Sequence, residues 1–451
     1  MVGFTKADAN PTKAFFVRMI TRDISLEDCI LDLIDNSIDG AWKLSGGHPM
    51  RLDDMTDLSN YKIEINATPQ EFTIIDNCGG ITLDDAIEYA FTFGRKERDA
   101  PDAYSIGVYG IGMKRAAFKI GESISIISTY KARKGLESFR VAIDVPTWLA
   151  DSSRDWDFDI ESSGDLKSAG VKLSIKSLHD SISSSFSSPT FIRDLGRTIG
   201  RDYALHIRRG LSICLNGKLI KGWEVELLQG SGFEPMRITY TDDLDGGIVN
   251  VEVLAGMAAP PPESLEPDDL MDGENRYGWY IACNGRIVLA ANKSDVSGWG
   301  TEDWPQWHPQ YSGFLGIVVF SSQNASLLPL TTTKRSVDVS SGVFRRARLR
   351  MRDASKQWIG YTNARKQSVE DAKTHEQQAK PTSIFGIPQR TTFLLPTIAS
   401  KPKVRMANIN YSMPLQRVRS LAEGFGNVNM SYRDVGIKSF ERSFSDLVGD
   451  E

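Results

Sequence analysis

Residues 31 to 42, LDLIDNSIDGAW, constrain the fold most, because polar side chains recur at a helical spacing within an apolar segment. We predict a helix over residues 24–44, beginning near Ser25, because Ser25-Leu26-Glu27-Asp28 fits a capping box. One broad face of this helix carries the apolar residues Ile30, Leu33, Ile34, Ile38 and Ala41. Another face carries Asp28, Asp32, Asn36 and Asp39. This polar face is either a solvated stripe or the lining of a cavity that holds a cation and a water.

The composition is that of an ordinary globular protein of two or three domains, with 451 residues, 41% hydrophobic and 25% charged. The longest run of apolar or glycine residues, 313–320, is too short to cross a bilayer, so no membrane is expected. The N-terminus lacks the pattern of a secretory signal. The four cysteines show no CxxC spacing, which suggests neither a zinc site nor a disulfide framework. We therefore expect a cytoplasmic protein.

The net charge of −5 hides an uneven distribution of charge along the chain. Residues 341–420 contain 16 Lys and Arg against 4 Asp and Glu, a balance of +12, so the remainder carries −17. A basic region of this kind favours a polyanionic partner such as DNA or RNA, although a solvated basic helix packed on the acidic body is the alternative.

Helical and strand patterns alternate from residue 12 to about 180, which predicts a mixed sheet covered by helices, an α+β sandwich. Strands are expected at 61–67, 71–77, 123–131, 137–145 and 170–178. Further helices are expected at 83–92 and 112–120, with a polar, glycine-containing stretch at 93–112. The serine-rich segment 181–189 is interpreted as a linker.

A second domain is expected after this linker, with Asn-Gly hairpins at CLNGKLI and ACNGRIV. The proline-rich, acidic segment 256–278 between them predicts a mobile loop. From Val343 onward, apolar residues at alternating threes and fours predict a helix with a heptad-like seam. Beyond Lys380 the sequence predicts irregular structure.

Three glycine-bearing or lysine-bearing turns suggest nucleotide chemistry. In IIDNCGGIT a strand runs into Asp76, whose carboxylate needs a donor such as the exocyclic amine of a base, unless the turn is an ordinary connection. In SIGVYGIGMKRAAFKIG the glycines Gly107, Gly110 and Gly112 form GxxGxG, which is neither a dinucleotide fingerprint nor a P-loop. Phosphate oxygens fit the backbone N–H groups that begin the following helix, those of Ile111, Gly112, Met113 and Lys114. The third turn, PLTTTKRS, contains Lys334, which alone is most simply a solvated lysine.

In this order the three motifs resemble those of the Bergerat-fold (GHKL) ATPases, which include type II topoisomerases, heat-shock chaperones, MutL proteins and histidine kinases. YGIGMK, GFLGIVVF and PLTTTK look most like the Microrchidia (MORC) ATPases and their bacterial relatives. The resemblance covers about residues 12–340. It implies a Bergerat-fold ATP-binding domain at 1–180 and a transducer-like α/β domain at 190–340. A basic helix and an irregular tail at 341–451 would follow.

The resemblance also implies a role for each matching residue. Asn36 would hold the Mg²⁺ that bridges the ATP phosphates, and Asp32 would orient and deprotonate the attacking water. Asp76 would accept a hydrogen bond from adenine, with Gly80 admitting the base, and Lys334 would reach the γ-phosphate from the transducer domain. The remaining predicted ATP-binding residues are Asp39, Gly110, Ile111, Gly112, Met113 and Lys114.

Three positions depart from the family pattern. Asp32 stands where the family has a longer Glu, which puts the rate of hydrolysis in doubt. Cys78 replaces the first glycine of the adenine turn, and Gly170-Val171 replaces a Gly-Thr pair, which puts nucleotide affinity in doubt.

These expectations describe a slow, Mg²⁺-dependent ATPase that acts as an ATP-gated homodimer, either as a nucleic-acid clamp or on a partner protein. One alternative is a sensor that closes on ATP without hydrolysing it. A histidine kinase is disfavoured, because none of the five histidines lies on a helix hairpin preceding the ATP site.

Overall fold

Helix α2 (Leu26–Ser45) begins at the predicted cap. Ser25 is the N-cap, and its side chain accepts a hydrogen bond from the backbone N–H of Asp28 at 3.0 Å. The helix ends at Gly46, whose φ of 68° is the left-handed conformation that closes many helices. Ile30, Ile34 and Ile38 are fully buried. The helix predicted over residues 24–44 is therefore confirmed.

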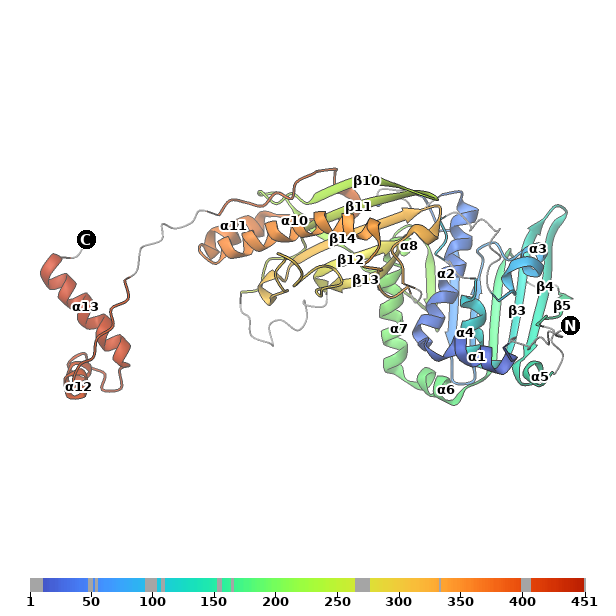
Figure 1. The fold of residues 1–451 in the computed structure, drawn as a ribbon, viewed down its shortest axis with the longest axis horizontal. Coiled ribbons are helices and arrows are strands. Elements are labelled where there is room, and N and C mark those ends of the chain that lie inside the picture. Colours follow the sequence, from blue (N-terminus) through green and yellow to red (C-terminus); the bar gives the residue numbers. More distant parts are fainter. Residues whose placement is uncertain are drawn as a thin grey trace, which may run out of the picture. The chain divides into compact units, whose positions relative to one another are not determined.

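The computed structural model describes residues 11–47, 52, 56–93, 104–106, 110–151, 156–163, 166–263, 276–331, 334–398 and 407–449. The chain divides into two compact units, Met1–Ala399 and Ser400–Glu451 (Figure 1). The helices are α1 (Lys13–Arg22), α2, α3 (Leu83–Asp85), η1 (Ala86–Ala90), α4 (Gly112–Ile120), α5 (Val145–Ala150), α6 (Asp180–Ser187), α7 (Pro189–Asp202), α8 (Ala204–Ile207), η3 (Pro309–Tyr311), η4 (Ala325–Leu327), α10 (Gly342–Arg365), α11 (Val369–Gln378), η5 (Ile384–Gly386), α12 (Leu415–Gly424) and α13 (Tyr432–Val448). The strands are β1 (Lys62–Ala67), β2 (Glu71–Asp76), β3 (Gly121–Ala132), β4 (Gly135–Asp144), β5 (Ile160–Ser162), β6 (Gly170–Leu178), β7 (Ser212–Leu215), β8 (Lys218–Leu219), β9 (Glu226–Gln229), β10 (Met236–Leu244), β11 (Gly247–Met257), β12 (Gly278–Cys283), β13 (Arg286–Asn292), β14 (Phe314–Ser322) and β15 (Lys380–Ser383).

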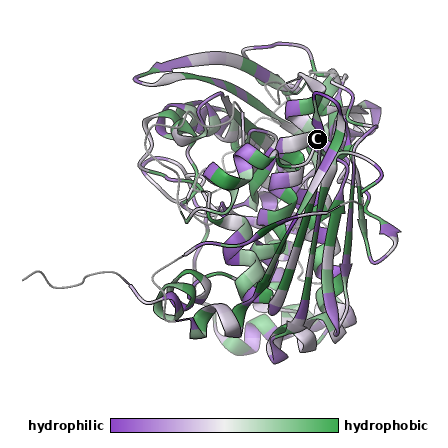
Figure 2. Ribbon diagram, turned by 90° about the vertical axis from the view of Figure 1, so that its right-hand side faces the viewer, coloured by the Kyte–Doolittle hydropathy of each residue, from purple (hydrophilic) through white to green (hydrophobic). Residues whose placement is uncertain are grey.

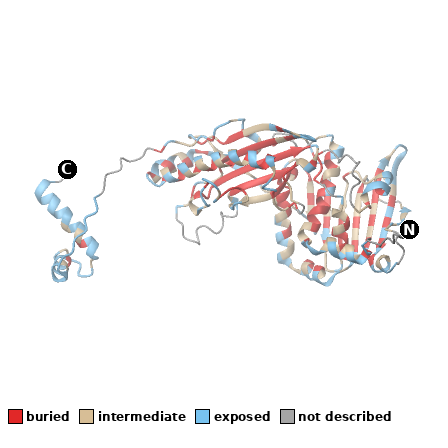
Figure 3. Cartoon of the chain, in the orientation of Figure 1, coloured by how far each residue is buried: buried red, intermediate tan, exposed pale blue. Residues whose placement is uncertain are grey.

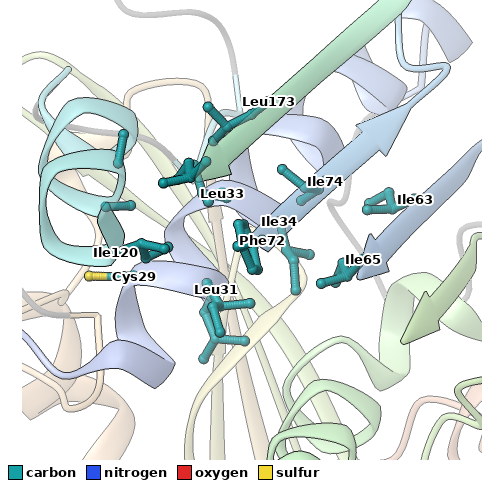
Figure 4. Close-up of a cluster of buried hydrophobic side chains, with 14 of the residues drawn as sticks. Cys29, Leu31, Leu33, Ile34, Ile63, Ile65, Phe72, Ile74, Ile120 and Leu173 are labelled. Atoms are coloured by element: carbon teal, nitrogen blue, oxygen red, sulfur yellow. The ribbon is translucent and has the colours of Figure 1, made fainter. Parts of the chain in front are cut away.

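The first sheet has eight strands in the order β5-β4-β3-β6-β2-β1-β7-β8. Neighbouring strands of this sheet pair antiparallel, except β1 and β7, which are parallel. Apolar side chains of α2 meet those of β1 and β2 in one core: Leu31, Leu33, Ile34, Ile63, Ile65, Phe72 and Ile74 (Figure 4). Each such side chain contributes about 1.5–3 kcal/mol when fully buried. The predicted α+β sandwich is confirmed.

Two predictions about the region after β6 are wrong. The serine-rich segment is not a linker but helix α6. Its residues Ile182 and Phe186, one turn apart, are buried in the core beneath the first sheet. The hairpin CLNGKLI forms as β7 and β8, but it joins the first sheet by pairing with β1 and not the second domain.

The second sheet has five strands in the order β10-β11-β14-β12-β13, and β12 and β14 run parallel. Helix α10 packs on this sheet through the predicted seam, with Phe344, Ala347, Met351, Ala354 and Trp358 fully buried. Figure 3 shows this burial along the strands and on one side of α10. Figure 2 shows the hydropathy of the residues on the ribbon, with hydrophobic residues in green and hydrophilic residues in purple. The basic helix therefore belongs to a folded core.

The second unit contains two helices, α12 and α13, where the sequence predicted irregular structure. The prediction of irregular structure is wrong. Only Ala422 and Val435 of these helices are buried, and apolar residues such as Leu421, Phe440 and Phe444 are exposed. Ser431 nevertheless caps α13 by accepting a hydrogen bond from the N–H of Asp434 at 3.1 Å.

Two other predictions are met only in part. The helix predicted at 83–92 is a short turn of α3 followed by the π-helix η1, which ends at Ala90. Gly107 and residues 264–275 of the predicted mobile loop lie outside the described residues. Within the described parts of the chain, no helix combines the length and the apolar character needed to cross a bilayer.

Candidate functional site

The polar face of α2 meets cations from distant parts of the chain. Asp32 is 4% exposed and accepts a hydrogen bond from Lys334 Nζ at 3.1 Å and from Arg115 Nη2 at 2.5 Å. Arg115 lies on α4, and Lys334 lies in the loop between β14 and α10. The structure thus brings together the predicted base and the predicted γ-phosphate lysine from positions 302 residues apart.

Asp35 lies one helical turn from Asp32 and is fully buried. It pairs with Arg286, which begins β13, and accepts hydrogen bonds from Lys334 Nζ at 2.8 Å and from the Tyr203 hydroxyl at 2.8 Å. Burial alone would raise the pKa of Asp35, but the positive charges of Arg286 and Lys334 outweigh burial and lower it. The same carboxylates raise the pKa of Lys334 against its own burial.

A third carboxylate of α2 repeats this arrangement nearer the start of the helix. Asp28 pairs with Arg335, which also lies 3.2 Å from Asp202 and 3.4 Å from Glu27. Sequence reasoning did not single out Arg115, Arg286 or Arg335. The available signal for Arg286 was a charged residue directly after an Asn-Gly turn between apolar strands.

The other half of the polar face is open. Asn36 is exposed, and Asp39 is half-buried. Asp39 Oδ1 accepts a hydrogen bond from the backbone N–H of Ile106 at 2.7 Å. Asn284 of the second sheet donates to the carbonyl of Ser105 at 3.0 Å. We call the glycine-containing segment 93–112 the lid. Its residues 104–106 are bonded to α2 on one side and to the turn between β12 and β13 on the other.

Asp76 ends β2 beside α2, as the adenine prediction requires. Its Oδ2 accepts from the Ser37 hydroxyl at 2.7 Å, and its Oδ1 accepts from the backbone N–H groups of Cys78 at 2.9 Å and Val171 at 3.2 Å. Burial raises the pKa of Asp76. A carboxylate has about four acceptor positions, so Asp76 still has room to accept from an amine. Cys78 and Val171, which depart from the family pattern, bind Asp76 through their backbone N–H groups. These two hydrogen bonds do not depend on the side chains of Cys78 and Val171.

Gly80 has a positive φ of 72°, and a Cβ there would overlap the carbonyl oxygen of Thr129. The neighbouring strand β3 therefore requires a glycine at this position, which is a different reason from the predicted approach of a base. Gly170 is similarly constrained, because its Cβ would overlap the carbonyl oxygen of Asp76.

The predicted phosphate loop leads into α4. Gly110 has a positive φ of 67°, and Ile111 is the N-cap of α4, with no side-chain hydrogen bond to the first turn. Gly112 approaches the site closely, since a Cβ there would lie 3.3 Å from Asp32 Oδ2. Met113 follows in the first turn of α4. The start of α4 and the carboxylate of Asp32 thus lie side by side.

Lys114 is turned away from Asp32. Its side chain is 4% exposed, and Nζ donates to the carbonyl of Ala90 at 2.8 Å. Burial lowers the pKa of Lys114 to about 8. The predicted contact between Lys114 and the nucleotide phosphates remains a prediction.

Helix α2, the turn after β2 and the start of α4, which carry the polar face and the first two predicted turns, lie together in the structure. Residues 24–154 match the family described as histidine kinase-, DNA gyrase B- and HSP90-like ATPases. No curated protein matches the sequence of this chain. The finer resemblance to Microrchidia ATPases stays a prediction.

Proposed function

We propose that the chain binds Mg²⁺-ATP between α2, the turn after β2 and the start of α4, and hydrolyses it slowly. The observation that carries this proposal is the meeting of Asp32, the N-terminus of α4 and Lys334. Lys334 Nζ, a cation suited to a terminal phosphate, lies 3.1 Å from Asp32 Oδ1. Gly112, at a helix start suited to phosphate oxygens, is so near that a Cβ added to it would lie 3.3 Å from Asp32 Oδ2.

Each residue has a distinct part in this reaction. Arg115 holds the Asp32 carboxylate from α4, so Arg115 is a positioning residue. Asp32 takes a proton from the attacking water. Lys334 must leave its ion pairs with Asp32 and Asp35 to meet the γ-phosphate, so binding of ATP is coupled to movement of the loop that carries it.

Magnesium fits Asn36 only in the presence of nucleotide. The described residues contain no group of three or more His, Cys, Asp or Glu side chains able to hold a metal alone. The exposed amide of Asn36 would supply one oxygen ligand, and phosphates and waters would supply the rest, as Mg²⁺ prefers. The bound metal would neutralise the phosphate charge.

A homodimer gated by ATP is the further step of the proposal. It rests on the contacts that join the lid to α2 and to the β12–β13 turn of the second sheet, because a nucleotide that moves the lid would also move that turn. The output of such a dimer would be clamping of nucleic acid or remodelling of a partner protein.

A non-hydrolysing ATP sensor is the second candidate, and one observation favours it. Both oxygens of Asp32 are engaged by cations, so two of its about four acceptor positions are already taken before the attacking water binds. The shorter side chain of Asp, compared with Glu, makes contact with this water harder.

The variant Asp32→Asn separates the two candidates. If Asp32 is the base, phosphate release should fall by roughly 10²-fold or more, while ATP affinity measured by calorimetry is retained. Asp32→Glu is the control, since it keeps the carboxylate and should keep or raise activity. Hydrolysis by Asp32→Asn at the wild-type rate would exclude Asp32 as the base. Absence of hydrolysis by the wild type would favour the sensor.

A further inference from the structure

A pocket of about 440 Å³ lies on the second sheet's side of the first unit, between the start of α10 and the loop after β13. Four arginines line it: Arg345, Arg346, Arg348 and Arg352. Arg345, Arg348 and Arg352 follow one another at spacings of three and four residues, so they form a single row along α10. Glu302 is the acidic residue of the lining.

The carboxylates near this pocket neutralise only two of the four arginines. Arg346 pairs with Asp242 at 2.9 Å, and Arg352 pairs with Asp303 at 3.4 Å and Glu302 at 3.6 Å. Among the described residues, no carboxylate forms an ion pair with Arg345 or Arg348. Arg348 Nη2 instead donates to the neutral hydroxyl of Thr301 at 2.6 Å. Hydrogen bonds of Ser340 and, more weakly, the charge of Arg345 lower the pKa of Asp338, so Arg345 has one carboxylate nearby without an ion pair. Neither Arg345 nor Arg348 is in direct contact with a carboxylate of the described residues.

Two further features favour an anion in the same pocket. Gly342, the first residue of α10, lines it, and Ser341 makes no side-chain capping bond, so the positive end of a 24-residue helix faces the pocket. Trp304 forms part of the wall and is 3% exposed. Its indole nitrogen is buried without a hydrogen-bond partner in the described part of the chain.

We propose that this pocket binds a phosphate group, held by Arg345 and Arg348. Guanidinium groups match phosphate oxygens in a bidentate geometry, and a cation that has no carboxylate in direct contact gains most from an anion. Arg348 is half-buried, and Arg345 is exposed. The exposed side chain of Glu302 (70% exposed) is free to turn toward solvent when the phosphate enters. The phosphate comes from a nucleic-acid backbone or from a phosphorylated small molecule. The proposal does not depend on ATP hydrolysis, because the pocket is separate from the Asp32 site.

The test uses the full chain with two probes, a short DNA duplex followed by fluorescence anisotropy and pyrophosphate followed by calorimetry. The double variant Arg345→Glu, Arg348→Glu should weaken the probe that binds by at least about tenfold. For the duplex, the slope of log affinity against log salt should also fall by about 2, because two phosphate contacts are lost. The matched control is Arg193→Glu, Arg197→Glu on α7, which changes the net charge equally at two exposed arginines.

Each outcome decides the proposal. Loss confined to the α10 variant supports it, with the duplex or pyrophosphate identifying the source of the phosphate. Equal loss in both variants means diffuse electrostatic attraction and overturns it, as does the failure of both probes to bind the wild type at low salt. Phosphate release from ATP, measured in the same variants, keeps this result separate from the proposed hydrolysis.

Discussion

The two halves of the polar face of α2 differ in the groups that bond to their side chains. The half with Asp28, Asp32 and Asp35 is paired with protein cations, and Asp35 and its partner Arg286 are almost completely buried. The half with Asn36 is exposed, and Asp39 there bonds to a backbone amide of the lid. We call the half with Asp28, Asp32 and Asp35 the coupling region, because its carboxylates are paired within the chain. We call the half with Asn36 and Asp39 the ligand region, because Asn36 is the proposed ligand of Mg²⁺.

Because of this difference, substitutions at neighbouring residues of α2 should affect different properties of the protein. Changes in the coupling region should lower stability and the communication between the sheets. Changes in the ligand region should lower nucleotide affinity and leave the fold intact.

The largest effect is expected for Arg286→Ala. Removing this cation leaves Asp35 buried without its main counter-charge, which should lower the free energy of unfolding by about 3–5 kcal/mol. Urea denaturation at neutral pH measures the change. Arg335→Ala is the control, because Arg335 is 25% exposed against 1% for Arg286 and its loss should cost less. Equal losses would erase the distinction between a buried and a partly exposed pair.

The next effect concerns Asn36→Ala, in the ligand region. Losing one oxygen ligand of the metal should weaken Mg²⁺-ATP binding by roughly 10- to 100-fold, the worth of about 1.5–3 kcal/mol. The free energy of unfolding should change by less than about 0.5 kcal/mol, because the side chain is exposed. Unchanged affinity in calorimetry would remove Asn36 from the site.

Lys334→Ala should have a smaller and more selective effect. Since Lys334 can meet only the terminal phosphate, affinity for ATP should fall on the order of tenfold more than affinity for ADP. Arg335→Ala, the next residue of the same loop, should leave the ratio of the two affinities unchanged. If ATP and ADP lose affinity equally, Lys334 acts only within the coupling region.

The smallest expected effect is the uptake of protons by Lys114 when ATP binds. With a pKa of about 8, this lysine carries on average about half a proton at pH 8. Nearby phosphates favour its charged form and raise the pKa, so ATP binding at pH 8 should take up about half a proton. Calorimetry in buffers of different ionisation enthalpy measures the uptake, and Lys114→Met should abolish it. No uptake by the wild type would place Lys114 away from the phosphates.

The ligand region was predictable because its signals are local. The cap at Ser25, the stripe through Asn36 and Asp39, and the turn after Asp76 are each contained within about one element. The structure gives a different reason for the glycine at position 80. The backbone of β3 leaves no room for a Cβ there, whereas the family resemblance attributes Gly80 to the approach of a base.

Lys334 was predicted to reach the site of Asp32 only through the family resemblance, and the arginines of the coupling region were not predicted, because they come from α4, β13 and the loop before α10. An arginine in a sequence does not indicate which carboxylate it will meet. Helix α6 was missed for another reason, namely that its serines dominate its composition and conceal the two buried residues Ile182 and Phe186.

The separation between Asp32 and Lys334 has a consequence for protein synthesis. At roughly 5–20 residues per second, a ribosome needs on the order of 15–60 s to add the 302 residues between them. During that interval the nascent chain gains Arg115 and all the strands of the first sheet, β1 to β8, before Lys334 is added. The ion pair between Asp32 and Lys334 can therefore form only after the second sheet has been translated.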